Sequence, residues 1–411
     1  MLAAAPSSDP SASRRDRPQI LAALSRVGVA LASFALVLVA VRAVAAPAGG
    51  SVIGGKLEYW RAHGREYDTL FLGSSHVLRA FVPAEFDRAA GESGLQTRSF
   101  NFGLQAVNLL EQRYLLGEIL DAHSGLERVF FEYQWLTPQI DPQNAFNPRT
   151  VYWHDAGTTT LAVQRALHWG AVLGDEFAYF EDPAQQHSIF SVAERLVPAG
   201  MHVAEEHLEH CLTERLMLGR GKDVLKGLLG REHGQTARFR EGDGYISLEE
   251  DERTLAAQGE ARNTYSVRRE RFLANQAAYL RDVDALDAAE QSFGDGEWVE
   301  AGLARVDDFE LIARIAEETR ARGVEFVLVI LPSQSANRRF EERLQEELGY
   351  LVLRYNLPER YPPLYDVAMR YDSGHLSAEG ARYFSRILAR DYVGQHGVPR
   401  DGAPRREGVP Q

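Results

Sequence analysis

The sequence predicts an α/β fold with a parallel sheet, preceded by an apolar helix near the amino terminus. Short predicted strands at 69–72, 98–102 and 128–135 alternate with segments of helical periodicity. The alternation returns after residue 305, where the nearly all-apolar stretch 324–331 has the composition of a strand buried on both faces. Strands and helices that alternate in this way imply parallel strands joined by right-handed crossovers.

The amino-terminal segment predicts a membrane anchor. The apolar stretch 20–46 contains the uncharged run 27–41, and a basic flank precedes it. A spanning helix needs about 20 mostly apolar residues, and the basic flank favours a cytoplasmic amino terminus with an exported body. Two alternatives remain: a signal peptide cleaved after 43–45, and a buried helix of a soluble protein. Arg42 argues against cleavage, because a signal peptidase site tolerates charge there poorly.

Length and charge restrict the function classes. A chain of 411 residues is long enough for a large core or two domains. The net charge is −13 and residues 1–46, with five arginines and two aspartates, carry +3, so the remainder carries −16. A body this acidic repels phosphate, and we expect no nucleic-acid partner. The single cysteine, Cys211, excludes an internal disulfide framework and a multi-cysteine metal site.

The remaining elements follow from periodicity and punctuation. Helices are predicted at 107–121, at 307–322 and at 336–348, the second of them closed by Gly323. A last short strand or turn is expected at 365–367. Ser377 then caps a final helix that runs to about residue 392.

These elements divide the chain into segments. Between the two α/β parts, turn signals and charges dominate and the recognisable pieces are helical, which predicts an insertion over or beside the sheet. One helical face of this insertion carries Phe272, Tyr279, Val283 and Leu286. The expected segments are a cytoplasmic tail at 1–19, a transmembrane anchor at 20–46, a linker at 47–66, core at 67–139, a partly helical insertion at 140–304, core at 305–396 and a disordered tail at 397–411.

Two remote loops carry candidate chemistry. Gly73-Ser74-Ser75 follows the first strand, which places a serine at the carboxyl end of a strand and at a helix start. Asp372 and His375 stand three residues apart in a glycine-containing loop before the last helix, so that the carboxylate can orient one imidazole nitrogen. The alternatives are a serine that only caps the helix and a histidine in a surface loop.

These motifs resemble those of the SGNH (GDSL-like) hydrolase superfamily. The blocks are Gly-Ser-Ser after strand one, Asn-x-Gly ending at Gly103, and Asp-x-x-His-Leu-Ser-x-x-Gly from Asp372. The resemblance covers roughly 67–139 and 305–395, and implies a flavodoxin-like three-layer parallel sheet. It also implies Ser75 as nucleophile, His375 as general base and Asp372 as its orienting acid.

The same resemblance implies an oxyanion hole built from the N–H groups of Ser75 and Gly103. Two departures stand out. Ser74 replaces the usual aspartate of the family, and no Gly-x-Asn-Asp block follows the third strand. Gln134 is the candidate for the missing oxyanion donor.

More loosely, Gly-Ser-Ser with an amino-terminal anchor resembles membrane-bound members that modify cell-envelope polymers, such as the D-alanine transfer protein and the alginate acetylation proteins. This implies an extracytoplasmic, single-pass serine esterase or O-acyltransferase of the inner or plasma membrane, acting on a polysaccharide. A multi-pass membrane acyltransferase would be its partner. The alternatives are a catalytically weak carbohydrate-binding or scaffold protein, motivated by the missing block, and a soluble cytoplasmic esterase.

Other polar and aromatic residues have two interpretations each. His76 is structural or substrate-facing, and Trp153 belongs to an aromatic group that either stacks on sugars or forms core. His207-x-x-His210 is either a polar helix face, which its acidic neighbours favour, or a metal site. We expect no metal. The sequence contains no glycine-rich phosphate loop and no nucleotide fingerprint, and we expect no cofactor.

Overall fold

The computed structural model describes residues 17–44, 50–122, 125–133, 148–177, 200–216, 225, 243–292, 297–333, 344–346 and 349–395. Contacts divide the chain into two compact units, and each is described here by itself. The larger unit comprises 49–211 and 232–411, and the smaller comprises 1–48 and 212–231.

The larger unit is α/β, with five parallel strands in the order β2-β1-β3-β4-β5. This is the doubly wound order of flavodoxin-like sheets. The strands are β1 (Thr69–Gly73), β2 (Ser99–Gly103), β3 (Arg128–Glu132), β4 (Glu325–Ile330) and β5 (Leu351–Arg354). The sequence predicted the first four within a few residues. It did not predict β5, which is only four residues long and has no alternating pattern.

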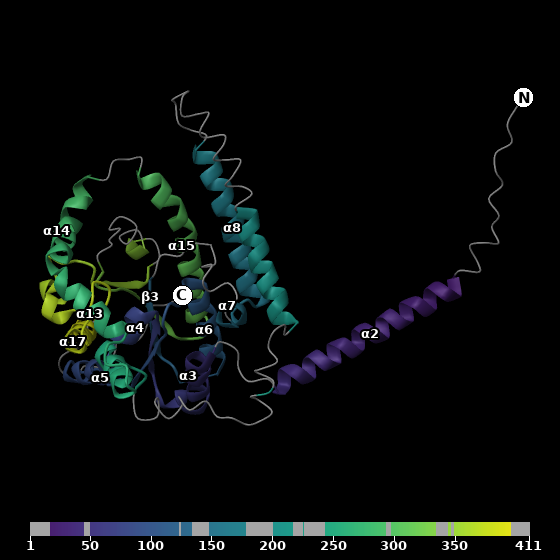
Figure 1. The fold of residues 1–411 in the computed structure, drawn as a ribbon, viewed down its shortest axis with the longest axis horizontal. Helices are drawn as coiled ribbons and strands as arrows, with labels where there is room; N and C mark the ends of the chain where they lie inside the picture. Colours follow the sequence, from purple (N-terminus) through teal and green to yellow (C-terminus); the bar gives the residue numbers. More distant parts are fainter. Residues whose placement is uncertain are drawn as a thin grey trace, which may run out of the picture. The chain divides into compact units, whose positions relative to one another are not determined.

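Helices cover both faces of the sheet, and β1, β2 and β3 are accordingly buried along their whole length (Figure 1). On one face, Phe71 and Phe130 belong to a core cluster shared with α5 (Pro83–Glu92) and α17 (Ala378–Gln395). On the other, α6 (Leu109–Ala122) contacts β1 and α15 (Glu297–Arg320) contacts β4. Most side chains of the five strands are therefore buried between two helical layers, with partly exposed residues at the start of β4 and at both ends of β5.

The linker predicted at 47–66 is wrong for 50–66, the part of it that the structure describes, because these residues are folded onto the body. It forms α3 (Gly50–His63) and η1 (Gly64–Glu66). Trp60 is fully buried, and the rings of Tyr59 and Trp60 lie 5.4 and 5.8 Å from that of Phe100 on β2. The glycines suggested a flexible connector, but the aromatic residues that follow them bind this helix to the edge of the sheet.

Lys56 fixes the same helix with a fully buried ammonium group. Its Nζ donates to the carbonyl oxygens of Asn101 at 2.9 Å, Gly103 at 2.8 Å and Gly244 at 3.0 Å. Three acceptors offset the cost of burying the charge. Strand β2 is thereby held between α3 on one side and residues 243–245 on the other.

The described segments between β3 and β4 are mainly helical. They include α7 (Pro148–Tyr152), α8 (Ala156–Phe177), a helix at 200–215, α12 (Leu248–Ala257), α13 (Thr264–Ala274) and α14 (Gln276–Ser292). The predicted apolar face of Phe272, Tyr279 and Val283 is buried in the core cluster beneath the sheet, so α13 and α14 are docked on the body. Because α15 begins at Glu297, the predicted boundary at 304/305 falls inside a helix.

The short strand or turn expected at 365–367 is a turn. Tyr365 ends the 3-10 turn η2 (Pro362–Tyr365), Asp366 caps the next one, and Val367 begins it as η3 (Val367–Met369). The helix predicted at 336–348 lies largely outside the described residues, as do the tails at 1–16 and 397–411.

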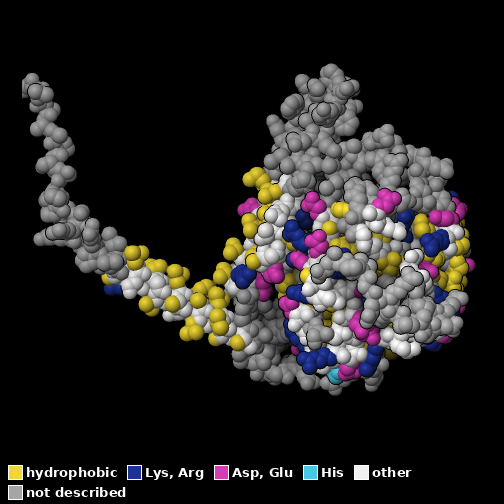
Figure 2. Space-filling view, turned by 180° about the vertical axis from the view of Figure 1, so that it is seen from behind, with side chains coloured by type: hydrophobic (Ala, Val, Ile, Leu, Met, Phe, Trp, Pro, Cys, Tyr) yellow, Lys and Arg dark blue, Asp and Glu magenta, His cyan; other side chains and the backbone are white. Residues whose placement is uncertain are grey.

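The smaller unit contains α2 (Arg17–Val44), where the anchor was predicted at 20–46. Its window Leu24–Val41 has a mean hydropathy of 2.2, and none of that window is buried. Figure 2 shows its surface covered by hydrophobic side chains. By length and composition this helix can cross a membrane, and a signal sequence has the same properties.

Candidate active site

Ser75 is the first residue of the short helix α4 (Ser75–Ala80), directly beyond the end of β1. The cap of that helix is Ser74, whose Oγ accepts a hydrogen bond from the backbone N–H of His76 at 3.1 Å. The alternative in which Ser75 only caps the helix is therefore wrong. Capping belongs to its neighbour, and the hydroxyl of Ser75 is left for another contact.

Asp372 and His375 lie in a loop that the backbone closes tightly. Tyr371 donates its N–H to the carbonyl oxygen of His375 at 2.9 Å, and Ser377 donates to that of Met369 at 2.9 Å. Ser377 also caps α17 as predicted, since its Oγ accepts from the N–H of Gly380 at 3.2 Å. The loop is thus built as one piece with the start of the last helix.

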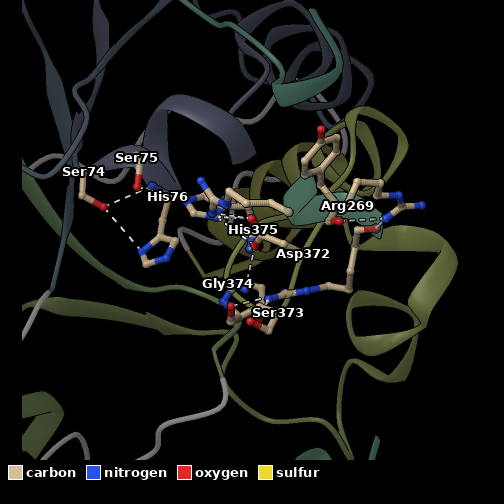
Figure 3. A network of polar contacts seen from close by, with 12 residues as sticks. Ser74, Ser75, His76, Arg269, Asp372, Ser373, Gly374 and His375 are labelled. Carbon is tan, nitrogen blue, oxygen red and sulfur yellow. Dashed lines mark hydrogen bonds and ion pairs between the residues drawn. The ribbon is translucent and has the colours of Figure 1, made fainter. Parts of the chain in front are cut away.

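The structure brings the two loops together (Figure 3). The Oγ of Ser75 lies 3.0 Å from Nε2 of His375, and Nδ1 of His375 lies 2.9 Å from Oδ1 of Asp372. A carboxylate only accepts hydrogen bonds, so Nδ1 carries the hydrogen and Nε2 accepts the proton of the hydroxyl. In this order of contacts an imidazole can take a proton from a serine while a carboxylate holds its orientation.

Asp372 is buried, and four donors surround its carboxylate. The N–H groups of Gly374 and His375 donate to Oδ1 at 2.8 and 2.7 Å, in addition to Nδ1 of His375. Arg268 pairs with Oδ2. Burial alone would raise the pKa of Asp372, but the hydrogen bond from His375 and the charges of His375 and Arg268 outweigh it and lower the pKa.

His375 has the opposite balance. Burial lowers its pKa, the hydrogen bond and charge of Asp372 raise it, and the neighbouring His76 and Arg268 lower it further. The net effect is a pKa below the ordinary value of histidine. The imidazole is therefore kept neutral, which is the form that accepts a proton.

Sequence reasoning missed Arg268, which comes from α13, about a hundred residues before the loop it touches. Its Nη2 lies 3.3 Å from Nδ1 of His375 in addition to its contact with Asp372. The adjacent Arg269 donates to the carbonyl oxygens of Arg370 and Tyr371. The only indication in the sequence was that two arginines, Arg268 and Arg269, stand close to Phe272, which packs α13 against the core.

The site lies at the point where the chain leaves the sheet in opposite directions. From β1 the connection runs to the edge strand β2, and from β3 it runs the other way to β4. Ser75 follows β1, and Glu132, the last residue of β3, accepts hydrogen bonds from both N–H and Oγ of Ser74. Open α/β sheets bind ligands in the crevice at this switch point.

Of the predicted oxyanion donors, the N–H of Ser75 is available and the N–H of Gly103 is already hydrogen-bonded. Among the described residues, no hydrogen bond engages the N–H of Ser75, so it is available. The N–H of Gly103 donates to Oδ1 of Asn101 at 2.8 Å, and Gly103 is buried. The prediction of Gly103 as a donor therefore fails for this arrangement, because its own strand already satisfies it. Gln134 lies outside the described residues.

Gly103 has a steric role instead. A Cβ at this position would lie 2.2 Å from the backbone nitrogen of Leu78. Only glycine lets the end of β2 pass this close to α4. The Asn-x-Gly motif thus positions the helix that carries Ser75, and Asn101 adds hydrogen bonds from Nδ2 to the carbonyl oxygens of Val77 and Phe81.

Trp153 was predicted to bind substrate, but its side chain is only 3% exposed and stacks on His154 at 3.8 Å. The alternative of an aromatic core is the one observed. His207 is also buried, with Nδ1 2.9 Å from Nε2 of His154, so the polar-face interpretation of His207-x-x-His210 is wrong for His207. Within the described residues, no group of three or more His, Cys, Asp or Glu side chains is placed to hold a metal ion.

A scan against models of known protein families finds no match for this chain, and a search of curated proteins finds none either.

Proposed function

We propose that this chain is a membrane-anchored, extracytoplasmic SGNH-like serine esterase or O-acyltransferase that modifies a cell-envelope or exported polysaccharide. The observation that carries the proposal is the continuous set of contacts from Ser75 through His375 to Asp372. A serine hydroxyl is a poor nucleophile until a base takes its proton, and these contacts supply both the base and its orienting group.

The proposed reaction proceeds in two steps. Ser75 Oγ attacks the acyl carbonyl carbon of a donor ester and passes its proton to Nε2 of His375, and the acyl-enzyme forms as the donor alcohol leaves. Water or a carbohydrate hydroxyl then takes the acyl group. The N–H of Ser75 stabilises the oxyanion, and one such donor contributes about 10²–10³ in rate.

Exposure supports access of a substrate to this place, since Ser75 and His375 are both partly exposed. A cavity of about 470 Å³, lined in part by Arg268, Phe272 and Gly374, adjoins the loop. Neither Ser75 nor His375 lines it, so this cavity lies next to the reacting groups and does not contain them. The anchor and the multi-pass acyltransferase partner rest on α2 and on the resemblance to envelope enzymes.

The test is reaction of the full-length protein with a fluorophosphonate probe, together with turnover of an acetyl-ester reporter. We expect Ser75 to be labelled, and Ser75→Ala to lose labelling and about three or more orders of magnitude of turnover. Turnover retained by this variant would refute the proposal.

The second candidate is a carbohydrate-binding or scaffold protein with little activity. The engaged N–H of Gly103 favours it, because the oxyanion hole then lacks a donor that the resemblance implied. A scaffold would leave Ser75 unlabelled by the probe while still binding polysaccharide. The labelling experiment therefore separates the two candidates.

A further inference from the structure

A second histidine stands next to the serine and is held in the same way as the first. Nδ1 of His76 lies 3.2 Å from Oε1 of Glu132. Because the carboxylate can only accept, Nδ1 carries a hydrogen, and Nε2 is the nitrogen left to exchange a proton with another molecule. Within the described part of the chain, nothing forms a hydrogen bond with that Nε2.

Glu132 is a buried group whose position is fixed. Its side chain is 1% exposed, and it accepts from the N–H of Ser74 and, at 3.1 Å, from the Oγ of Ser74. A buried carboxylate is costly unless donors satisfy it. Ser74, the residue that replaces the usual aspartate of the motif, is one of these donors. It links Glu132 to the turn that carries Ser75 and His76.

The two imidazole rings lie next to each other. Their ring centroids are 4.9 Å apart, with 39° between the ring planes. Nε2 of His375 is already occupied by Ser75 Oγ at 3.0 Å. The side chain of His76 is 35% exposed against 12% for His375, so His76 is the imidazole that an entering molecule meets first. Figure 3 shows His76 between Ser74 and Gly374.

We propose that His76 is a second catalytic residue, which exchanges protons with the leaving and entering alcohols while His375 serves Ser75. Glu132 is its positioning residue. This inference rests on the proposed function, since it assigns the alcohol side of the same acyl transfer. A single histidine that serves both alcohols and the serine must make four proton transfers in sequence, and with a second imidazole each ring makes two of them.

The proton balance of the cycle closes with one proton shared between the two rings. The cycle starts with His76 protonated on both nitrogens, so that Nδ1 donates to Glu132 and Nε2 carries the proton for the donor alcohol. In acylation, the Ser75 proton goes to Nε2 of His375, the bond from Oγ to the acyl carbon forms, and the donor C–O bond breaks as its oxygen takes the proton from Nε2 of His76, which becomes neutral. In transfer, the acceptor O–H gives its proton to Nε2 of His76, its oxygen bonds to the acyl carbon, and Ser75 Oγ leaves with the proton from His375. The starting state is restored without any further reactant.

The test uses the full-length protein and the variant His76→Gln. A nitrophenolate leaving group needs no acid, so the burst of nitrophenol from nitrophenyl acetate reports acylation without the donor-side proton. Fluorophosphonate labelling reports the Ser75–His375 pair in the same way. We expect both to stay within about twofold of wild type. Steady-state turnover, which requires activation of the acceptor, should fall by about 10²–10⁴, as for loss of a general base.

A matched control is His63→Gln. His63 is 38% exposed and its Nδ1 lies 2.9 Å from Glu66 at the surface, so it has the same type of partner outside the site. His63→Gln should change neither the nitrophenol burst nor the steady-state turnover. Glu132→Gln should reproduce the loss in steady-state turnover, because an amide no longer fixes the tautomer of His76.

Three outcomes decide the matter. A fall in steady-state turnover with an intact burst supports the proposal. An equal fall in burst, labelling and turnover overturns it, because His76 would then only support His375 through ring contact. Unchanged turnover overturns it as well. Failure of wild-type Ser75 to label would instead refute the proposed function, so that the two failures are distinguishable.

Discussion

Gly380→Ala tests whether the close contact between the start of α17 and the loop before it positions His375 relative to Ser75. Gly380 is in the first turn of α17, and a Cβ there would lie 2.1 Å from the carbonyl oxygen of Met369. Because the clashing atom belongs to the backbone of Met369, rotation of a side chain cannot relieve the clash and the loop itself must move. Overpacking of this kind costs typically about 1–3 kcal/mol. That exceeds the roughly 0.5–1 kcal/mol by which alanine improves on glycine inside a helix.

The displaced carbonyl group is part of the active-site loop. Met369 accepts the N–H of Ser377 at 2.9 Å, and this bond closes the segment that contains Asp372 and His375. A shift at Met369 therefore moves Nε2 of His375 away from Ser75 Oγ. We expect a lower free energy of unfolding in denaturant titration and at least a tenfold slower fluorophosphonate labelling of Ser75.

Gly394→Ala is the control, since it makes the same change in the same helix. No atom lies within 4 Å of a Cβ built at Gly394, which is exposed near the end of α17. This variant should be as stable as wild type or slightly more so, with labelling unchanged. If Gly380→Ala matched it in stability and labelling, the argument that close backbone contact positions the loop would be refuted.

Two further changes test the electrostatics and the buried cation. Arg268→Gln removes a charge that lowers the pKa of His375, so that pKa should rise and the acid limb of the labelling rate should move to higher pH. The other groups that face His375, Asp372 and His76, remain in place. Arg271→Gln, one turn further along α13, should leave the pH profile unchanged, and a shift to lower pH in Arg268→Gln would contradict the reasoning. Lys56→Met removes the donor that three buried carbonyl oxygens share, and it should lower the free energy of unfolding by about 3 kcal/mol or more. Its control is Arg61→Met, which changes an exposed side chain of the same helix and should lower that free energy by less than about 1 kcal/mol.

The features that the sequence predicted are those encoded locally. Strands β1 and β4 lie in largely apolar runs, and the hydrogen bond between Asp372 and His375 spans only three residues. The contact between Ser75 and His375 spans 300 residues, yet it was predictable because two recognisable motifs end at the same edge of a parallel sheet.

The features that it did not predict depend on pairs without a local signal. Glu132 looks like the polar end of an apolar strand, and only the sheet order places it beside His76, 56 residues away. Arg268 meets Asp372 across 104 residues. In α3, glycines suggested a flexible linker, because nothing near Lys56 in the sequence indicates the three carbonyl groups that satisfy it. Gly103 was misjudged because Asn101, two residues away, accepts its N–H.

The energetics of Asp372 favour an enzyme over a scaffold. A loop that only needs its amides capped is served by a neutral side chain such as Asn or Ser, at little cost in desolvation. Here an ionised carboxylate is buried, which is expensive, and it is offset by two backbone N–H groups, by Arg268 and by an imidazole. Capping of the loop accounts for the two backbone N–H groups, but it does not account for the imidazole of His375. The imidazole at His375 is in turn kept neutral and aimed at Ser75, a contact that stabilises no part of the loop. An imidazole placed to accept a proton, beside a hydroxyl that does not cap its helix, is the arrangement that the proposed catalysis requires.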